Sequence, residues 1–357
     1  MNMISKWAHL ARAVWLSNFD SLPSPYKLTY AVTSRCNSRC RFCGVWQKKA
    51  TPELTLDDIN SLARNMPALQ WIDFTGGEPT LRPDLADIIA AFKKWCPALI
   101  YVHFPTNGLQ PEKIAAVCNR VAALRLPRFI VTVSIDGPPA IHDELRGVPD
   151  AFARASETIR QLRALDGVEV FVGMTLYGRN VNSIDDTVSA LVDAIPGFSG
   201  RGMHLNFPHR SDHFYGNADA DFCLAPDAIT STVEKLKQTR HFPTTPFALV
   251  ERMYQDRIPA YFRTGKCPQR CAALQSSVFL APDGTVYPCS MWSQPLGNVR
   301  DCDFNISSLI RSSRAQSLRR DLVNKECPNC WTPCEAYPTL AANLIPRLLP
   351  RRDSKKA

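Results

Sequence analysis

The amino-acid sequence predicts an α/β fold built on a parallel sheet. After Ser24-Pro25, strand-like apolar stretches alternate with amphipathic, helix-like stretches as far as about residue 207, which is the pattern of repeated βα units. Most of these strands end in glycine or polar turn residues, where loops leave a sheet. Six such units are too few to close the standard eight-stranded barrel, but they can form an open one.

The predicted strands are short and mostly apolar, and span Leu28–Thr33, Trp71–Phe74, Leu99–Phe104, Phe129–Ile135, Glu169–Thr175 and Gly202–Phe207. Helices are expected between them at Leu56–Asn65, Asp84–Trp95, Pro111–Ala123, Ala151–Leu165 and Ile184–Ala194. In (β/α) barrels the chemistry sits at the carboxyl ends of the strands, so the motifs that follow the strands are the candidates for a functional site.

Outside the barrel, the chain predicts a helix at its amino end and a second region after residue 225. Between Met3 and Phe19, apolar residues recur at helical spacing: Trp7, Leu10, Ala11, Val14 and Trp15. The polar residues Lys6, His9 and Arg12 interrupt any long apolar run. This pattern indicates an amphipathic helix rather than a signal peptide or a membrane span. We expect it to pack on the protein's own barrel, with a membrane surface as the alternative.

The second region begins with helices expected at Ala228–Gln238 and Phe247–Tyr261, and continues into a cysteine-rich segment. Between Cys271 and Cys289, a Pro282-Asp283-Gly284 turn predicts a β-hairpin. The expected organisation is therefore an amino-terminal helix (1–25), a barrel (26–225), linker helices with a cysteine-rich domain (226–340) and a basic tail (341–357).

Charge and cysteine usage narrow the classes of partner. The net charge is +9, and much of the basic excess lies in the tail, at Arg347, Arg351, Arg352, Lys355 and Lys356. No stripe of Lys and Arg interleaved with aromatics occurs in the body, so direct nucleic-acid binding is not expected, whereas peripheral contact of the ends with an anionic membrane stays open. Thirteen Cys without an export signal indicate a reducing cytoplasm, where thiols serve metals.

Three thiols lie within eight residues directly after the first strand, at Cys36, Cys40 and Cys43. Three thiolates from one short loop can hold three irons of a cubic iron–sulfur cluster and leave the fourth iron open for a small molecule. A zinc site is the competing interpretation of clustered cysteines.

At this loop the sequence resembles the radical SAM enzymes, whose signature is Cys-x3-Cys-x-aromatic-Cys, and Phe42 fills the aromatic position. The resemblance implies an open three-quarter barrel and a 4Fe-4S cluster on Cys36, Cys40 and Cys43 whose open iron binds S-adenosylmethionine (SAM). It also implies reductive cleavage of SAM to a 5′-deoxyadenosyl radical, with an electron donor such as flavodoxin or ferredoxin. The cofactor carries the radical chemistry, while the protein binds, orients and shields.

The resemblance also assigns SAM contacts downstream. Gly76, Gly77, Glu78 and Pro79, after the second strand, match the segment that binds the methionine amino group, and paired glycines let backbone approach a ligand. Ser134 and Arg146 match the contacts to the SAM carboxylate, which hydroxyl and guanidinium donors suit. Asp136 is expected to form a turn rather than act as a catalytic acid.

Polar residues crowd together just past the sixth strand, and we predict that they form a substrate wall: His204, Asn206, His209, His213 and Tyr215. The competing interpretation is a polar strand end with a surface loop. The isolated Cys96, Cys118 and Cys223 are expected to be buried as small apolar residues.

The spacing Cys271-x12-Gly284-x4-Cys289, followed by Cys327-x2-Cys330, resembles the auxiliary-cluster extension called SPASM or, when shortened, twitch. The resemblance implies one auxiliary 4Fe-4S cluster on Cys271, Cys289, Cys327 and Cys330, with Cys267 and Cys334 as alternate ligands. A zinc knuckle is the alternative, because Cys-Pro-Asn-Cys is common in zinc sites.

An auxiliary cluster can take up an electron from a substrate radical. We therefore expect a dehydrogenase-like oxidoreductase acting on a small-molecule, sugar-like or lipid-like metabolite. The alternative is a maturase of a ribosomally made peptide or protein; such enzymes often carry an amino-terminal recognition domain, for which about 25 residues are too few. A non-catalytic iron–sulfur protein is a second alternative, which the retained Gly76-Gly77 segment disfavours. The activity of the family's sulfatase maturases is also disfavoured, because Ser290 stands where those enzymes have Asp.

Overall fold

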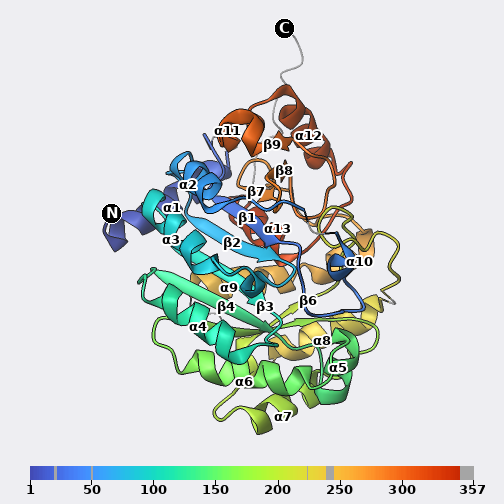
Figure 1. The fold of residues 1–357 in the computed structure, drawn as a ribbon. Coiled ribbons are helices and arrows are strands. Elements are labelled where there is room, and N and C mark those ends of the chain that lie inside the picture. Colours follow the sequence, from blue (N-terminus) through green and yellow to red (C-terminus); the bar gives the residue numbers. More distant parts are fainter. Residues whose placement is uncertain (20–21, 50, 223, 239–244, 346–357) are drawn as a thin grey trace.

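In the computed structural model, a nine-stranded sheet runs through the protein in the order β6-β5-β4-β3-β2-β1-β7-β8-β9 (Figure 1). The structure describes residues 1–19, 22–49, 51–222, 224–238 and 245–345. Strands β1 (Lys27–Thr33), β2 (Trp71–Gly76), β3 (Tyr101–Thr106), β4 (Arg128–Ser134), β5 (Glu169–Thr175) and β6 (Met203–Asn206) are parallel neighbours. The predicted partial (β/α)6 barrel is therefore confirmed.

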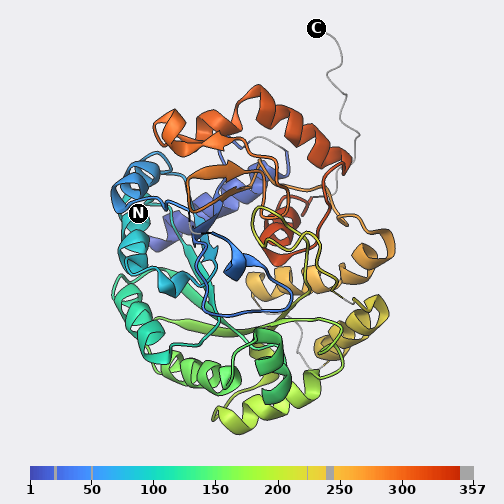
Figure 2. The same ribbon diagram turned by 45° about the vertical axis from the view of Figure 1, so that its right-hand side comes forward.

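Helices cover the outer face of this sheet in an arc that Figure 2 shows from blue to yellow-green. They are α2 (Leu56–Arg64), α3 (Leu85–Trp95), α4 (Pro111–Ala122), α6 (Ala151–Arg163) and α7 (Ile184–Ala194), close to the predicted positions. Fully buried Ile72, Phe74, Phe92 and Val102 pack between sheet and helices. Cys96 and Cys118 belong to the same core, as predicted, whereas Cys223 lies outside the described residues.

A short helix that the sequence analysis did not predict, α5 (Pro139–Arg146), precedes α6 and ends at Gly147 with φ 62°. This helix brings Arg146 back towards the cysteine loop, because the Arg146 carbonyl accepts a hydrogen bond of 2.9 Å from the Arg39 N–H. The position of Arg146 thus depends on an element that is only eight residues long.

The cysteine-rich region is joined to the barrel sheet. Strand β7 (Ser277–Leu280) pairs in parallel with β1, and β8 (Thr285–Tyr287) and β9 (Gly297–Asn298) continue the sheet antiparallel. The predicted hairpin is confirmed, with Gly284 at φ 90° in its turn. The pairing of β7 with β1 could not be predicted, because the two strands are about 250 residues apart and the pattern of one sequence does not show which distant strands pair.

The remaining helices are α8 (Pro226–Gln238), α9 (Pro246–Gln255), α10 (Ile258–Thr264), α11 (Ile306–Ile310), α12 (Ser313–Asn324) and α13 (Pro333–Ala341), with short 3₁₀ turns η1 (Val45–Gln47), η2 (Pro79–Leu81), η3 (Gly200–Gly202) and η4 (Val299–Cys302). The prediction of a single helix over Phe247–Tyr261 is wrong, because α9 ends at Gln255 and α10 begins at Ile258. Pro259 lacks the N–H that a continuous helix needs and is favoured in a first turn.

The predicted amino-terminal helix is α1 (Met3–Ser17), capped by the Asn2 side chain. It packs on the protein through Ala13 and Ser17, and Lys6 Nζ donates a hydrogen bond of 3.0 Å to the Leu99 carbonyl. None of the described helices is both long and apolar enough to cross a bilayer.

A buried ion pair lies at the centre of the sheet. Lys27 Nζ lies 2.8 Å from Asp73 Oδ2, and the two side chains are 0% and 9% exposed. Burial alone would raise the pKa of the Asp73 carboxyl, but Lys27 and His103 hold it well below its usual range. A buried pair of this kind costs stability when one partner is removed, because the other charge is left without compensation.

We predict that Lys27→Met lowers the free energy of unfolding by about 3–5 kcal/mol in urea titrations, and that adding Asp73→Asn to it recovers part of the loss. Arg120→Met, which removes one partner of the exposed Arg120–Asp87 pair, is the control and should cost less than about 1 kcal/mol. Equal urea midpoints for Lys27→Met and the unmodified protein would contradict the assigned role of the pair.

Candidate active site

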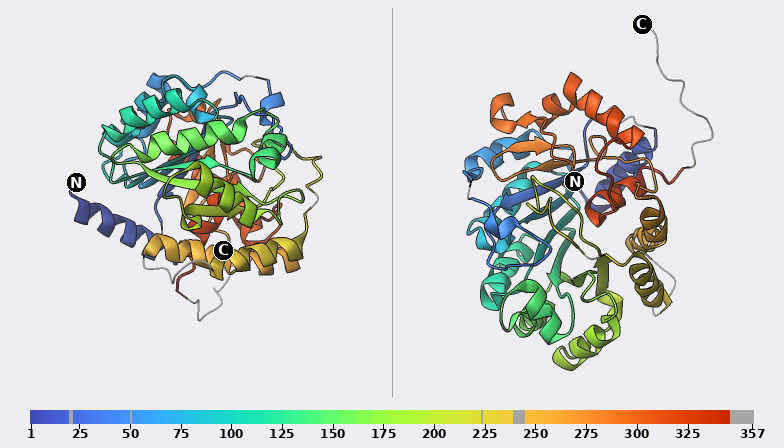
Figure 3. Two further views of the ribbon diagram at one scale, coloured as in Figure 1. Left: turned by 90° about the horizontal axis from the view of Figure 1, so that it is seen from below. Right: turned by 90° about the vertical axis from the view of Figure 1, so that its right-hand side faces the viewer.

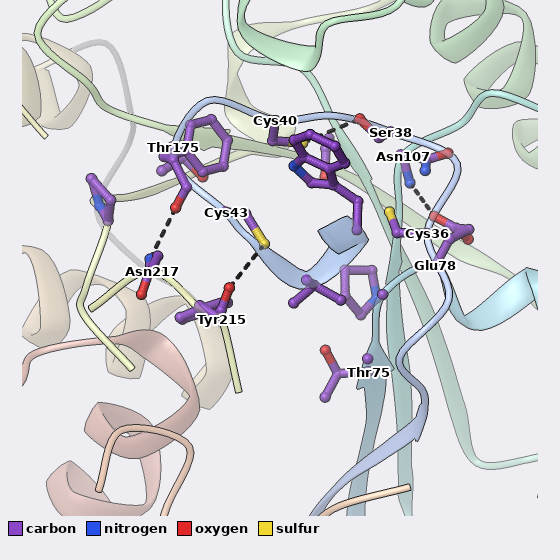
Figure 4. A pocket seen from close by; sticks show the side chains of 18 of the residues that line it. Cys36, Ser38, Cys40, Cys43, Thr75, Glu78, Asn107, Thr175, Tyr215 and Asn217 are labelled. Carbon is purple, nitrogen blue, oxygen red and sulfur yellow. Dashed lines mark hydrogen bonds between the residues drawn. The ribbon is translucent and has the colours of Figure 1, made fainter. Parts of the chain in front are cut away.

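Cys36, Cys40 and Cys43 line one cavity of about 200 Å³ at the carboxyl ends of the strands. Figure 4 shows the three cysteines on a single loop, with Thr75 of β2, Thr175 of β5 and Tyr215 around the same space. The cavity is also lined by residues predicted to contact SAM: Phe42, Gly76, Gly77, Glu78, Ser134 and Arg146. Pro79 is not among the lining residues and instead begins the 3₁₀ turn η2.

Two glycines bring the end of β2 against the cysteine loop. A Cβ on Gly77 would lie 2.1 Å from the Arg35 carbonyl oxygen, and one on Gly76, at φ 137°, 2.1 Å from that of Thr33. The N–H groups of Gly77 and Glu78 donate hydrogen bonds of 2.8 Å to the same two carbonyls. Any side chain would push the loop away from the strand, so the glycines fix the distance between the thiols and the strand ends.

Glu78 is a buried carboxylate whose oxygens are held by the chain itself. It accepts hydrogen bonds from Thr80 Oγ1 at 2.6 Å, Thr106 Oγ1 at 2.8 Å and the Asn107 N–H at 2.7 Å. Burial raises the pKa of this carboxyl. Glu78 therefore ties the ends of β2 and β3 together at the wall of the cavity.

Arg146 places a buried positive charge beside the thiols. Its Nη1 lies 3.6 Å from Cys40 Sγ, and its Nη2 forms a 2.6 Å ion pair with Asp136, which is fully buried. Asp136 also accepts a hydrogen bond of 2.8 Å from the Thr175 N–H. Asp136 thus orients Arg146 and links β4 to β5.

A second group of thiols surrounds a small cavity of about 20 Å³ beside β7 and β8, lined by Cys267, Cys271, Cys289, Cys327 and Cys330. Asn329, in the turn between Cys327 and Cys330, adopts a φ of 54° and accepts a hydrogen bond of 3.2 Å from the Cys267 N–H. Glu335 lines the same cavity and accepts hydrogen bonds from Ser290 and Ser277. Ser290 is fully buried, and both its N–H and its hydroxyl donate to Glu335.

The barrel encloses a third cavity of about 250 Å³, which shares Thr75, Pro105, Ser134, Thr175, Asn206, Phe214 and Tyr215 with the thiol-lined cavity. Because alternate residues of a strand face the same side, its walls form layers. Below the shared layer lies a polar layer of Asp73, His103, Thr132 and His204, and below that an aromatic layer that includes Trp71, Tyr101 and Phe171. Cys334 lines this barrel cavity and not the small one.

Both histidines of the polar layer are held by carboxylates. His103 Nδ1 lies 3.2 Å from Asp73 Oδ1, and its Nε2 lies 3.0 Å from Thr132 Oγ1. His204 Nδ1 lies 3.3 Å from Glu251 Oε2, and Glu251 in turn accepts a hydrogen bond from the Tyr337 hydroxyl. Such pairs fix the orientation of the imidazole rings.

The residues predicted as a substrate wall divide between the cavities and the core. Asn206 and Tyr215 line both the thiol-lined and the barrel cavity, and His204 lines the barrel cavity. Asn206 Oδ1 is buried and has no hydrogen-bond partner among the described residues, which leaves it available to a ligand.

His209 and His213 have structural partners. His209 touches the thiol-lined cavity, but its Nε2 accepts from the Trp331 N–H at 3.1 Å and its Nδ1 donates to the Phe207 carbonyl at 2.9 Å. His213 lines neither cavity and stacks on Tyr287 at a centroid distance of 4.1 Å. Burial lowers the pKa of each imidazole to about 4, so both are neutral links between the loop after β6 and the cysteine-rich region.

Comparison with known proteins identifies the family. The model of the radical SAM superfamily matches residues 30–191. An AdoMet-dependent heme synthase of Oleidesulfovibrio alaskensis is 30% identical over 305 residues, which cover 80% of this chain and 74% of that protein. The chain belongs to the radical SAM superfamily.

Other matches extend over the cysteine-rich region. The SPASM iron–sulfur cluster-binding domain matches residues 271–331. The sporulation killing factor maturation protein SkfB of Bacillus subtilis is 24% identical over 85% of this radical SAM chain and 69% of its own length. The solved structure of anSMEcpe with bound AdoMet and a Cp18Cys peptide has the same fold, with a TM-score of 0.58, 17% identity and 84% of each chain covered.

The cofactors of this radical SAM enzyme are SAM with a 4Fe-4S cluster, and an iron–sulfur cluster in the SPASM region. The residues present fit these groups. Burial raises the pKa of Cys36 to about 11 and of Cys43 to about 12, so these thiols need a bound cation to become thiolates. Ser134 and Arg146 offer hydroxyl and guanidinium donors in the same cavity.

The comparisons favour iron–sulfur over the zinc alternative. The domain model that matches residues 271–331 describes an iron–sulfur cluster-binding domain. The superfamily model that matches residues 30–191 covers the loop of Cys36, Cys40 and Cys43.

Sequence reasoning missed the polar layer of the barrel, although a signal was present. Asp73 and His103 each interrupt an apolar strand at a position that alternates with other inward-facing residues. Glu251 and Tyr337 carried no such signal, because they come from α9 and α13, whose packing against the barrel only the tertiary structure reveals. Cys334 was predicted only as an alternate cluster ligand, and its place in the barrel cavity likewise depends on α13.

We expect the loop thiols and the SPASM thiols to hold separate clusters. Replacing Cys36, Cys40 and Cys43 together with Ala should reduce the iron and sulfide of the anaerobically reconstituted protein to about half. Cys40→Ala alone should abolish 5′-deoxyadenosine formation with dithionite, whereas Cys96→Ala, a buried thiol that lines neither cavity, should preserve both readouts.

Two results would contradict this assignment. Unchanged SAM cleavage in Cys40→Ala would exclude the loop as the SAM-cluster site. Zinc retained in place of iron by the triple variant would identify the carboxyl-terminal thiols as a zinc knuckle.

Proposed function

We propose that this protein is a maturase-type radical SAM enzyme that removes a hydrogen atom from a side chain of a peptide or protein substrate. The observation that carries the proposal is the shared wall of the thiol-lined cavity and the barrel cavity. A group held in the barrel cavity lies directly against the space that the thiols and the SAM-contacting residues surround.

The size and lining of the barrel cavity support a side chain as its occupant. Its volume of about 250 Å³ is sufficient for one large side chain. Its aromatic layer suits an apolar group, and its polar layer can bind one heteroatom. The similarity to SkfB, which is named as a maturation protein, and to the peptide-bound anSMEcpe structure supports the same substrate class.

When bound, SAM and its cluster supply the 5′-deoxyadenosyl radical that abstracts the hydrogen. The chain's own residues hold the reactants. Cys36, Cys40 and Cys43 anchor the cluster, and Ser134 with Arg146 orients the SAM carboxylate. Asn206 offers its buried side-chain oxygen Oδ1 to the substrate at the boundary of the two cavities. A contact there matters because a small misplacement of the target hydrogen lowers the rate strongly.

The polar layer can hold a proton near the substrate. If Nδ1–H of His103 donates to Asp73, Nε2 accepts from the Thr132 hydroxyl, and the ring can take a proton at that atom. His204, oriented by Glu251, offers a second imidazole in the same layer. Either ring can accept the proton that leaves a substrate during oxidation.

An oxidative outcome is supported by the position of the SPASM thiols, for which we propose Cys271, Cys289, Cys327 and Cys330 as ligands. Cys330 and Trp331 line the small cavity, and the next residues, Thr332 to Cys334, line the barrel cavity. The two spaces are thus separated by one short run of chain, which suits uptake of an electron from the substrate. An electron donor of the flavodoxin or ferredoxin type and a reducing cytoplasm complete the proposal.

A second candidate is a small-molecule substrate, which the sequence analysis favoured. The relative from Oleidesulfovibrio alaskensis, named as a heme synthase, matches over 74% of its own length. In this case the substrate would extend beyond the barrel cavity into the thiol-lined cavity.

The test of the substrate class is transfer of deuterium from a deuterated cell extract into 5′-deoxyadenosine. We predict label transfer that is lost when the extract is first digested with a protease and the protease removed. Label from a protease-resistant fraction of low molecular mass would establish the small-molecule candidate instead.

The same assay tests the barrel cavity. His204→Ala and Asn206→Ala should leave uncoupled SAM cleavage within about twofold while label transfer falls about a hundredfold or more. His9→Ala, on α1 and outside both cavities, is the matched control. If His204→Ala and Asn206→Ala transfer label as well as the unmodified protein does, the barrel cavity does not bind the substrate.

A further inference from the structure

Helix α1 presents an apolar stripe to the outside of the protein. Ile4 is 81%, Trp7 41% and Trp15 59% exposed. Exposed Ala8 and Ala11 lie between them at helical spacing, so these residues share one face of the helix. A contiguous exposed apolar stripe with two tryptophans differs from the scattered apolar residues of ordinary surfaces and indicates a binding surface.

The opposite face of α1 is the one that holds the helix in place. Lys6 Nζ binds the Leu99 carbonyl, Ala13 and Ser17 are buried, and Leu10 packs against the apolar cluster of Ile100, Tyr101 and Ile130. The left view of Figure 3 shows α1 at the edge of the molecule, reaching beyond the sheet. The packing therefore fixes the apolar stripe on the outer side.

The basic tail begins next to this helix. The Ile345 N–H donates a 3.0 Å hydrogen bond to Asn18 Oδ1, and Asn18 Nδ2 donates one of 2.9 Å to the Ala341 carbonyl. Residues 346–357 follow in the sequence and lie outside the described residues; they carry Arg347, Arg351, Arg352, Lys355 and Lys356 against one acidic residue, Asp353. Twelve residues span at most about 40 Å, which exceeds the length of α1, about 22 Å.

We propose that α1 and the basic tail together dock the enzyme on the surface of an anionic lipid bilayer. An apolar helix face and a polybasic segment are the two signals that stable peripheral binding needs, and tryptophan is favoured at the membrane–water interface.

The charge favours a lipid surface over a second copy of the chain. Residues 3–17 and 346–357 contain seven Lys and Arg and one acidic residue, so two copies meeting at this face would repel each other. The same charges attract anionic headgroups.

Docking through α1 orients the active site. Leu99, to which Lys6 binds, lies just before β3, at the amino ends of the strands, whereas the thiol-lined cavity lies at their carboxyl ends. The membrane would therefore contact the closed end of the barrel and leave the cavity mouth facing the aqueous phase. Docking of the enzyme on a membrane does not depend on whether its substrate is a peptide or a small molecule.

The experiment measures co-flotation of the full-length reconstituted protein with vesicles of phosphatidylcholine containing about 30% phosphatidylserine. We expect binding that falls when salt is raised from about 0.1 M to about 0.5 M, because the polybasic share of the attraction is screened. Trp7→Ser with Trp15→Ser should weaken binding at least about tenfold. Arg347, Arg351 and Arg352 changed to Gln should weaken it about a hundredfold or more.

Matched controls separate this surface from general effects. Val192→Ser removes a 48% exposed apolar side chain on α7, and Lys113, Arg125 and Arg154 changed to Gln remove three exposed charges from α4, the turn after it and α6. These variants should bind as the unmodified protein does, and every variant should retain 5′-deoxyadenosine formation with dithionite, which shows that it is folded and loaded.

Three results would overturn the proposal: no binding to these vesicles at any salt concentration, equal loss of binding in the controls, or equal binding to vesicles of phosphatidylcholine alone. Concentration-dependent association without lipid that Trp7→Ser with Trp15→Ser abolishes would assign the stripe to a second copy of the chain and would also overturn it.

Discussion

The approach of the Gly76–Gly77 backbone to the backbone of the cysteine loop is the contact on which the site depends. No side chain fits at either position, because a Cβ would lie 2.1 Å from a carbonyl oxygen. The loop is therefore sealed against the end of β2, and its three thiols face the strand ends across a single cavity. Glu78 and Arg146 reinforce this arrangement: Glu78 joins β2 to β3, and Arg146 Nη1 lies 3.6 Å from Cys40 Sγ.

The second constraint is the alternation of side chains along the strands. It stacks a shared layer, a polar layer and an aromatic layer inside the barrel, so that a substrate group would meet SAM above it and two carboxylate-held imidazoles beside it. Helix α13, which follows the residues matched by the SPASM domain, completes this chamber with Cys334 and Tyr337. Pairing of β7 with β1 holds the whole region against the barrel.

Local pattern was sufficient to predict the βα units, the hairpin and the thiol loop, since each depends on neighbouring residues in the chain. The substrate wall was only partly predictable. His204 and Asn206 reach a cavity because they alternate on β6, but His209 and His213 are bound by Trp331 and Tyr287, more than 70 residues away in the sequence. The split between α9 and α10, the parallel pairing of β7 and the partner of His204 on α9 likewise depend on tertiary packing, which local propensity does not determine.

The most direct measurement of the central claim is an anaerobic crystal structure of the protein with both clusters and SAM. The account predicts that the methionine part of SAM lies in the thiol-lined cavity near Ser134 and Arg146, with its 5′-carbon at the layer shared with the barrel cavity and the polar layer left free. An adenosine group that fills the barrel cavity and contacts His103 and His204 would contradict the account, because no chamber for a substrate side chain would remain.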